Sequence, residues 1–161
     1  MKSLMIAALA VMTVVSVAAQ DTSSVTGTKG LDRYVELLRS DLRTGKVELY
    51  TRTLGLSAKD SIAFWPLYRE YDFKLSKIGD EVIKLLQDYT GAHDHLTNAM
   101  AEDLMKRNFK LRGDQLDLRK TYFKKISKAT SPKVAALFFQ MENQIQLLIE
   151  VQIASQTPLV R

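Results

Sequence analysis

The sequence predicts an all-α protein, an elongated bundle of about four to five helices built around a long helical hairpin. Apolar residues recur at spacings of three and four, which is the period of one face of a helix. Serine or threonine stands just before several of these periodic segments, where a helix needs an N-cap. No stretch alternates apolar and polar residues for long enough to indicate a strand.

Residues 1–19 have the pattern of a secretory signal peptide. Lys2 provides a positive start, residues 4–17 form an apolar run, and Ala19 ends a small-residue cleavage site. The apolar run is shorter than the ~20 residues of a membrane-spanning helix. We therefore expect cleavage after Ala19, a periplasmic location and no transmembrane segment in the mature chain.

The rest of the chain is long enough for one domain with its own core. Removal of nineteen of the 161 residues leaves 142, and the chain has no cysteine for disulfides. Residues 20–30 are rich in Ser, Thr and Gly and are expected to form a flexible lead-in. Residues 31–161 are expected to form a single helical domain.

The mature chain is mildly basic. Without Lys2 it has 22 basic residues against 18 acidic ones. A basic surface on an exported protein favours acidic unfolded proteins or anionic lipids as partners, and we expect no nucleic acid.

Two short amphipathic segments come first. The spacing of the first predicts a helix over 31–45, ending near Gly45, and the second a shorter helix closed by Gly55. The periodic residues are Leu31, Val35, Leu38 and Leu42, then Val47, Tyr50 and Leu54.

A long helix is predicted to begin after Ser57, and the Asp60 carboxylate in its first turn interacts favourably with the helix dipole. Burial of each seam residue contributes roughly 1.5 to 3 kcal/mol, which outweighs the ~3 kcal/mol helix penalty of Pro66, so Pro66 should kink the helix and not end it. The seam consists of Phe64, Tyr68, Tyr71, Leu75, Ile78, Val82, Leu85 and Tyr89.

Two more helices are predicted after a turn at 91–95. Thr97 caps a helix that runs to about Lys128, and Ser131 caps a last helix with Pro132 at its first position. Residues 157–161 should lie extended. The seam of the last helix consists of Val134, Phe138, Met141, Ile145 and Leu148.

A polar stripe interrupts the apolar face of the predicted helix 97–128. Arg112 and Arg119 fall within an arc that is otherwise apolar. This arc is wide enough to contact two neighbouring helices. An unpaired buried guanidinium costs several kcal/mol, so we expect Arg112 or Arg119 to pair with Glu142 of the last helix. The alternative is a polar groove or a dimer seam. The stripe also includes Asn108 and Gln115.

His93 and His95 flank Asp94 in the predicted turn and are the candidate metal ligands. Transition-metal sites need three or four converging ligands, and without cysteine the others must be carboxylates such as Asp88 or Glu102. A solvated turn is the favoured interpretation of this triplet.

The residues indicate no catalytic machinery. No glycine-flanked serine elbow and no phosphate-binding glycine loop is present in the sequence. Acid pairs are adjacent in sequence and therefore diverge on a helix. We expect a protein that is not an enzyme and uses no cofactor.

The two later helix starts resemble the Leu-Thr-x-x-Gln motif of the Spy and CpxP group of exported bacterial helical proteins. Leu56-Ser57-Ala58-Lys59-Asp60 has Ser for Thr and Asp for Gln, and Thr130-Ser131-Pro132-Lys133-Val134 lacks both the leucine and the glutamine. The resemblance extends over roughly residues 31–158 and includes the leader and the long hairpin.

This resemblance implies an ATP-independent chaperone or envelope-stress adaptor, often dimeric, that holds partly unfolded proteins on a cradle of helices. It implies client-binding roles for exposed lysines on one helix, namely Lys106, Lys110, Lys120 and Lys124. The chain is also similar to periplasmic metal-sensor relatives of that group. The alternative function is therefore a periplasmic sensor that signals to a membrane partner.

Overall fold

The computed structural model describes residues 45–157, all of which belong to one compact unit. They are helical over most of their length and contain no strand, which confirms the all-α helical bundle. The predictions for residues 1–44 and 158–161 lie outside the described residues.

The longest described helix, α2, spans Ala58–Ala92 and begins where the sequence predicts. The Ser57 hydroxyl accepts a hydrogen bond from the Asp60 backbone amide at 3.1 Å. The helix continues through Pro66. The apolar seam therefore outweighs the missing backbone hydrogen bond, as expected.

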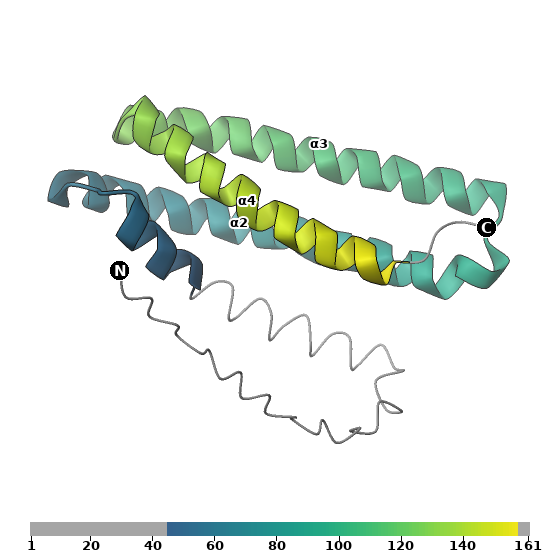
Figure 1. The fold of residues 1–161 in the computed structure, drawn as a ribbon. Coiled ribbons are helices and arrows are strands. Elements are labelled where there is room, and N and C mark those ends of the chain that lie inside the picture. Colours follow the sequence, from purple (N-terminus) through teal and green to yellow (C-terminus); the bar gives the residue numbers. More distant parts are fainter. Residues whose placement is uncertain (1–44, 158–161) are drawn as a thin grey trace, which may run out of the picture. The chain divides into compact units, whose positions relative to one another are not determined.

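A short 3-10 turn, η1 (His93–His95), joins α2 to α3 (Asn98–Ala129). Thr97 caps α3 by accepting a hydrogen bond from the Met100 amide at 3.2 Å. Helices α2 and α3 lie side by side and run in opposite directions (Figure 1), which confirms the predicted helical hairpin.

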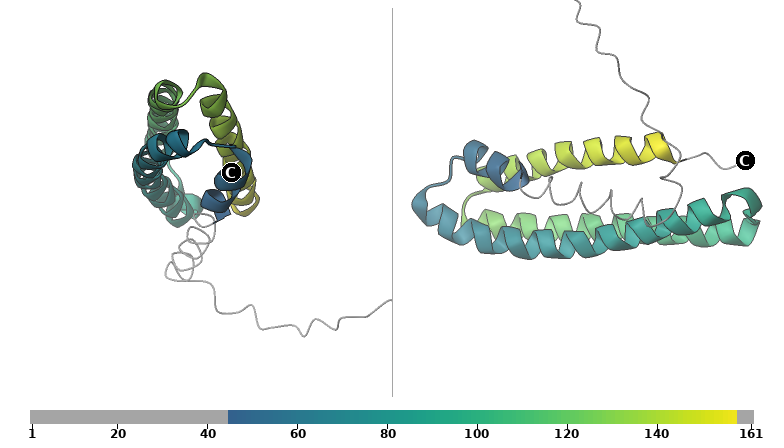
Figure 2. Two further views of the ribbon diagram at one scale, coloured as in Figure 1. Left: turned by 90° about the vertical axis from the view of Figure 1, so that its left-hand side faces the viewer. Right: turned by 90° about the horizontal axis from the view of Figure 1, so that it is seen from below.

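The last helix, α4, spans Pro132–Gln156. Its N-cap is Ser131, whose hydroxyl accepts from the Val134 amide at 3.2 Å, and Pro132 occupies the first turn as predicted. α4 packs on α3 and runs back in the direction of α2 (Figures 1 and 2).

A short helix over residues 45–53 precedes α2. Gly45 is helical and is the first described residue, so the predicted end of the helix over 31–45 lies outside the described residues. Gly55 has a positive φ of 56°, a conformation that glycine adopts without steric cost, and it ends the short helix as predicted.

The core is an aromatic cluster contributed by all four helices of residues 45–157. Phe138 of α4 lies at its centre, with its ring centroid 5.2 Å from that of Tyr50 and 5.3 Å from that of Phe64. Most of these ring pairs are edge-to-face, an arrangement that aromatic quadrupoles favour. The fully buried rings are Tyr50, Phe64, Tyr71, Tyr122 and Phe138.

The α2 seam is confirmed, because every predicted residue is buried or half-buried. The α4 seam is correct as far as Ile145 and wrong at Leu148, which is 73% exposed. The sequence period continues to the end of α4, but among the described residues no helix covers Leu148.

Candidate functional site: a groove between α3 and α4

The four predicted client-binding lysines are all exposed on α3. Lys110 pairs with Asp114 at 2.5 Å and Lys120 with Asp117 at 3.3 Å, each within one helical turn. Lys106 and Lys124 form no ion pair with the described part of the chain. The structure therefore places these side chains where a ligand can reach them, on one helix.

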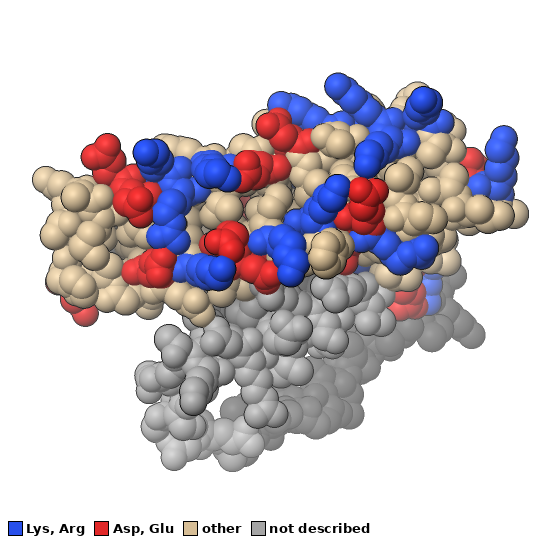
Figure 3. Space-filling model, turned by 180° about the vertical axis from the view of Figure 1, so that it is seen from behind, with Lys and Arg blue, Asp and Glu red and all other residues tan. Residues whose placement is uncertain are grey.

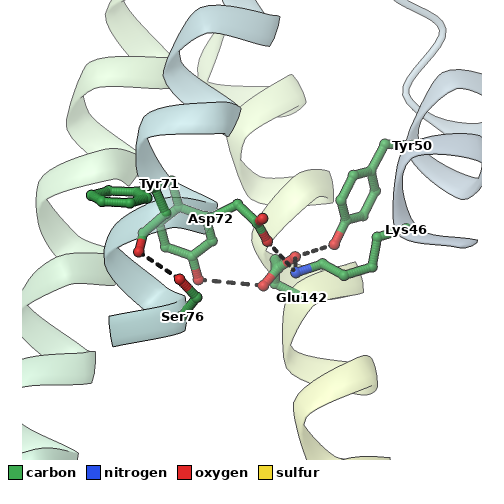
Figure 4. A network of polar contacts seen from close by, with 7 residues as sticks. Lys46, Tyr50, Tyr71, Asp72, Ser76 and Glu142 are labelled. Atoms are coloured by element: carbon green, nitrogen blue, oxygen red, sulfur yellow. Dashed lines mark hydrogen bonds and ion pairs between the residues drawn. The ribbon is translucent and has the colours of Figure 1, made fainter. Parts of the chain in front are cut away.

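Glu142 is buried, but the predicted pairing with Arg112 or Arg119 is wrong. Its carboxylate pairs with Lys46 at 2.7 Å and accepts hydrogen bonds from the hydroxyls of Tyr50 and Tyr71 (Figure 4). Lys46 also contacts Asp72 at 3.5 Å. The network joins residues 45–53, α2 and α4, and both members of its ion pair are nearly excluded from water, with side chains 10% and 5% exposed.

Helix periodicity does not identify the partner of Lys46, although it does indicate the face on which Lys46 lies. Its position four residues before Tyr50 and eight before Leu54 places it on the apolar face of a helix. A lysine at such a position is one signal that a buried carboxylate lies opposite, since an unpaired buried charge is costly.

The same network raises two tyrosine pKa values. Burial raises the pKa of Tyr50 well above its usual value of 10, and the Glu142 carboxylate raises it further. Burial likewise raises the pKa of Tyr71, with Glu142 adding to the effect and Arg119 opposing it. Both phenols are held neutral because an anion beside Glu142 in a low-dielectric environment is unfavourable.

We expect alkaline pH to unfold the protein through these two tyrosines. Since their pKa is higher in the folded state than in the unfolded state, the stabilisation that they provide is present below pH 10 and is lost as the pH rises above it. Phenolate absorbance and circular dichroism followed in one titration should show at least two tyrosines ionising only as helix is lost, since Tyr122 is also fully buried and its pKa is also raised. Ionisation of every tyrosine with the helices intact would contradict the network.

Arg112 and Arg119 lie on the side of α3 that faces α4. Arg112 pairs with Glu150 at 3.4 Å, and the Arg119 guanidinium donates to the Asn143 side-chain oxygen at 3.3 Å. Asn143 is neutral, so the charge of Arg119 is not compensated by this contact. The alternative interpretation of the polar stripe, a polar groove, fits this arrangement.

Two hollows that meet at Arg119 form what we call the α3–α4 groove. The first is lined by polar side chains and two leucines, and the second, lined by two aromatic rings and three cations, presents almost wholly apolar surface. The first is lined by Arg112, Gln115, Leu116, Arg119, Asn143, Gln146, Leu147 and Glu150; the second by Arg119, Lys120, Phe123, Lys124 and Phe139.

The groove is strongly basic. Four of its lining residues are cations, and Glu150 is the one carboxylate among the described residues that line it. The chain between Asp117 and Glu142 contains six basic residues and no acid. On the face that points away from α4, Figure 3 shows Lys and Arg gathered toward the end of α3 that leads into α4, whereas acids and bases mix elsewhere on that face.

Large apolar side chains are exposed along α3 and α4. Phe109 is 66% exposed, although the sequence placed it on the arc that contacts neighbouring helices. α3 presents an apolar arc wider than the described helices cover, so part of it stays in water. The exposed apolar residues of these two helices are Met105, Phe109, Leu116, Phe123, Leu147, Leu148 and Val151.

The His93–His95 turn does not assemble a metal site within residues 45–157. No group of three His, Asp or Glu side chains suited to an ion occurs among the described residues. The His93 ring stacks on Tyr89 with centroids 5.6 Å apart, and His95 is exposed. The sequence-based preference for a simple turn over a metal centre is compatible with this arrangement.

Fold and groove together define an all-α helical protein with a basic, partly apolar surface groove. No family model matches the chain, and comparisons with curated proteins and with solved structures find no match. None of the helices in the described part of the chain combines the length and the apolar character of a membrane span.

Proposed function

We propose that this chain is an exported, ATP-independent chaperone that binds partly unfolded proteins on α3 and α4. The observation that carries the proposal is the α3–α4 groove. There the exposed Leu116, Leu147 and Phe123 lie beside Arg119 and Lys124, which form no ion pair with the described residues. Monomeric proteins rarely leave such apolar surface uncovered unless it binds something.

Weak, non-specific holding of unfolded chains needs the features that this groove has. Apolar side chains contribute burial energy with any apolar client, and positive charge speeds the encounter with acidic ones. The Leu-Thr-x-x-Gln-like helix starts and the leader of residues 1–19 support the same proposal and a periplasmic location. Envelope proteins that lose their fold after export are the clients that this location offers.

The proposal is tested by light scattering of chemically reduced α-lactalbumin, which aggregates as it unfolds. An equimolar amount of the mature chain should suppress scattering without nucleotide. Leu116→Ser and Leu147→Ser should each weaken suppression, because an apolar residue that becomes fully buried contributes roughly 1.5 to 3 kcal/mol, or about tenfold or more in affinity.

Ile62→Ser is the matched control. Ile62 is at least as exposed as Leu116 and Leu147 but lies on α2, outside the groove. The Ile62→Ser variant should suppress scattering as the wild type does. If the wild type fails to suppress scattering, or if all three variants lose suppression equally, the groove is not the client-binding surface.

A further inference from the structure

We propose that the α3–α4 groove selects acidic polypeptide segments in which apolar residues flank a carboxylate, and that Arg119 and Lys124 bind this carboxylate. This rests on the proposed function, since it names the class of protein segment that the same groove binds.

The charge of the groove is available to a ligand. Arg119 donates only to the neutral Asn143, and Lys124 has no ion-pair partner among the described residues. Arg112 is held by Glu150 at a long 3.4 Å. A peptide carboxylate that reaches Arg119 gains a charge-assisted hydrogen bond and displaces no carboxylate of the protein.

The shape of the groove separates the apolar and charged parts of the ligand. Phe123 and Phe139, with ring centroids 6.2 Å apart, form an apolar hollow on one side of Arg119. Leu116 and Leu147 border the hollow on the other side. A segment with one apolar side chain for each hollow and an acid between them matches this order.

The length of the groove favours a short peptide over a membrane surface. At 1.5 Å per residue, Arg112 and Lys124 are about 18 Å apart along α3, the length of about twelve helical residues or of five to six extended ones. The first hollow, which Arg119 lines, is recessed, and a single chain fits it better than a flat layer of headgroups does. A polypeptide is therefore the occupant that we infer.

The test is fluorescence anisotropy with a labelled synthetic peptide of about twelve residues that carries phenylalanine, leucine and glutamate in this order of apolar and acidic positions. The mature chain should bind this peptide about tenfold more tightly than the same peptide with every Glu replaced by Gln. Raising the salt concentration should reduce that difference, because screening weakens exposed charge pairs.

The double variant Arg119→Gln/Lys124→Gln should bind the acidic peptide about tenfold more weakly and the glutamine peptide with unchanged affinity. The control variant Arg69→Gln/Lys77→Gln removes the same charge from exposed positions on α2, outside the groove, and should bind as the wild type does. Circular dichroism melting verifies that both double variants are folded.

Equal binding of the two peptides, or equal loss in the groove and control variants, would overturn the inference. Tight binding to phosphatidylglycerol vesicles without binding of the acidic peptide would also overturn it, in favour of a lipid surface. If the groove variant still suppresses α-lactalbumin aggregation but no longer distinguishes the peptides, charge selection is supported and holding depends on apolar contact. If the acidic peptide binds selectively but aggregation is never suppressed, the chaperone function fails and the selectivity stands.

Discussion

Replacing Lys46 by alanine is expected to destabilise the fold by about 3 kcal/mol, because removal of one member of a buried ion pair leaves the other charge uncompensated. Glu142 is 5% exposed at its side chain, and its remaining partners, Tyr50 and Tyr71, are neutral donors. The measurement is urea unfolding followed by circular dichroism.

Arg52→Ala is the matched control, since Arg52 lies in the same short helix. Its pair with Glu48 is 76% and 61% exposed, and such surface pairs contribute at most about 0.5 kcal/mol. Equal losses in Lys46→Ala and Arg52→Ala would show that Lys46 does not neutralise Glu142.

A double-mutant cycle separates the ion pair from packing. Glu142→Gln should destabilise the wild type, but it should recover stability in the Lys46→Ala background, because it removes the buried charge. The amide oxygen can still accept from one tyrosine hydroxyl, and the amide nitrogen can donate to the other. Additive losses in the double variant would argue against the pair.

Phe138→Ala is expected to cost roughly 3–5 kcal/mol, the largest loss for a single side chain outside the ion pair. Phe138 is fully buried and its ring contacts those of Tyr50, Phe64, Tyr68 and Tyr71. Because these four rings belong to two separate helical segments, residues 45–53 and α2, their collapse into the cavity is restricted.

Phe73→Ala controls for the loss of an aromatic side chain. Phe73 is 62% exposed on α2, and substitutions at such positions change the free energy of unfolding by about 0.5 kcal/mol or less. Thermal melting of both variants measures the two losses of stability. Comparable losses would mean that Phe138 is not the centre of the core.

The described helices could be predicted from sequence because their signals are local. Ser57, Thr97 and Ser131 each accept a hydrogen bond from a backbone amide three residues later, and Gly55 takes a positive φ. Each of these depends only on neighbours within one helical turn, so the local sequence determines it.

The partner of Glu142 could not be predicted in the same way. Lys46 lies 96 positions earlier in the chain, and its approach depends on how residues 45–53 dock between α2 and α4. The arginine hypothesis used the right physical reason, that a buried charge needs a partner, but periodicity gives the face of a helix and not its tertiary neighbour.

The groove was anticipated only as an alternative. The polar stripe that contains Arg112 and Arg119 correctly indicated the face of α3 on which the groove lies. Which apolar residues beside it stay exposed depends on the position of α4, which the sequence pattern does not give. Leu148 is a second case in which helix periodicity does not give the tertiary neighbour. Its spacing matches that of the buried residues of α4, but no described helix covers it.

Hydrogen–deuterium exchange on the mature chain, with and without reduced α-lactalbumin, tests most directly whether α3 and α4 hold unfolded proteins. We predict slower exchange around Leu116–Lys124 and Phe139–Glu150 when the client is present, and no change in α2 near Ile62. Protection confined to α2, or no protection at a client concentration that suppresses aggregation, would contradict the account.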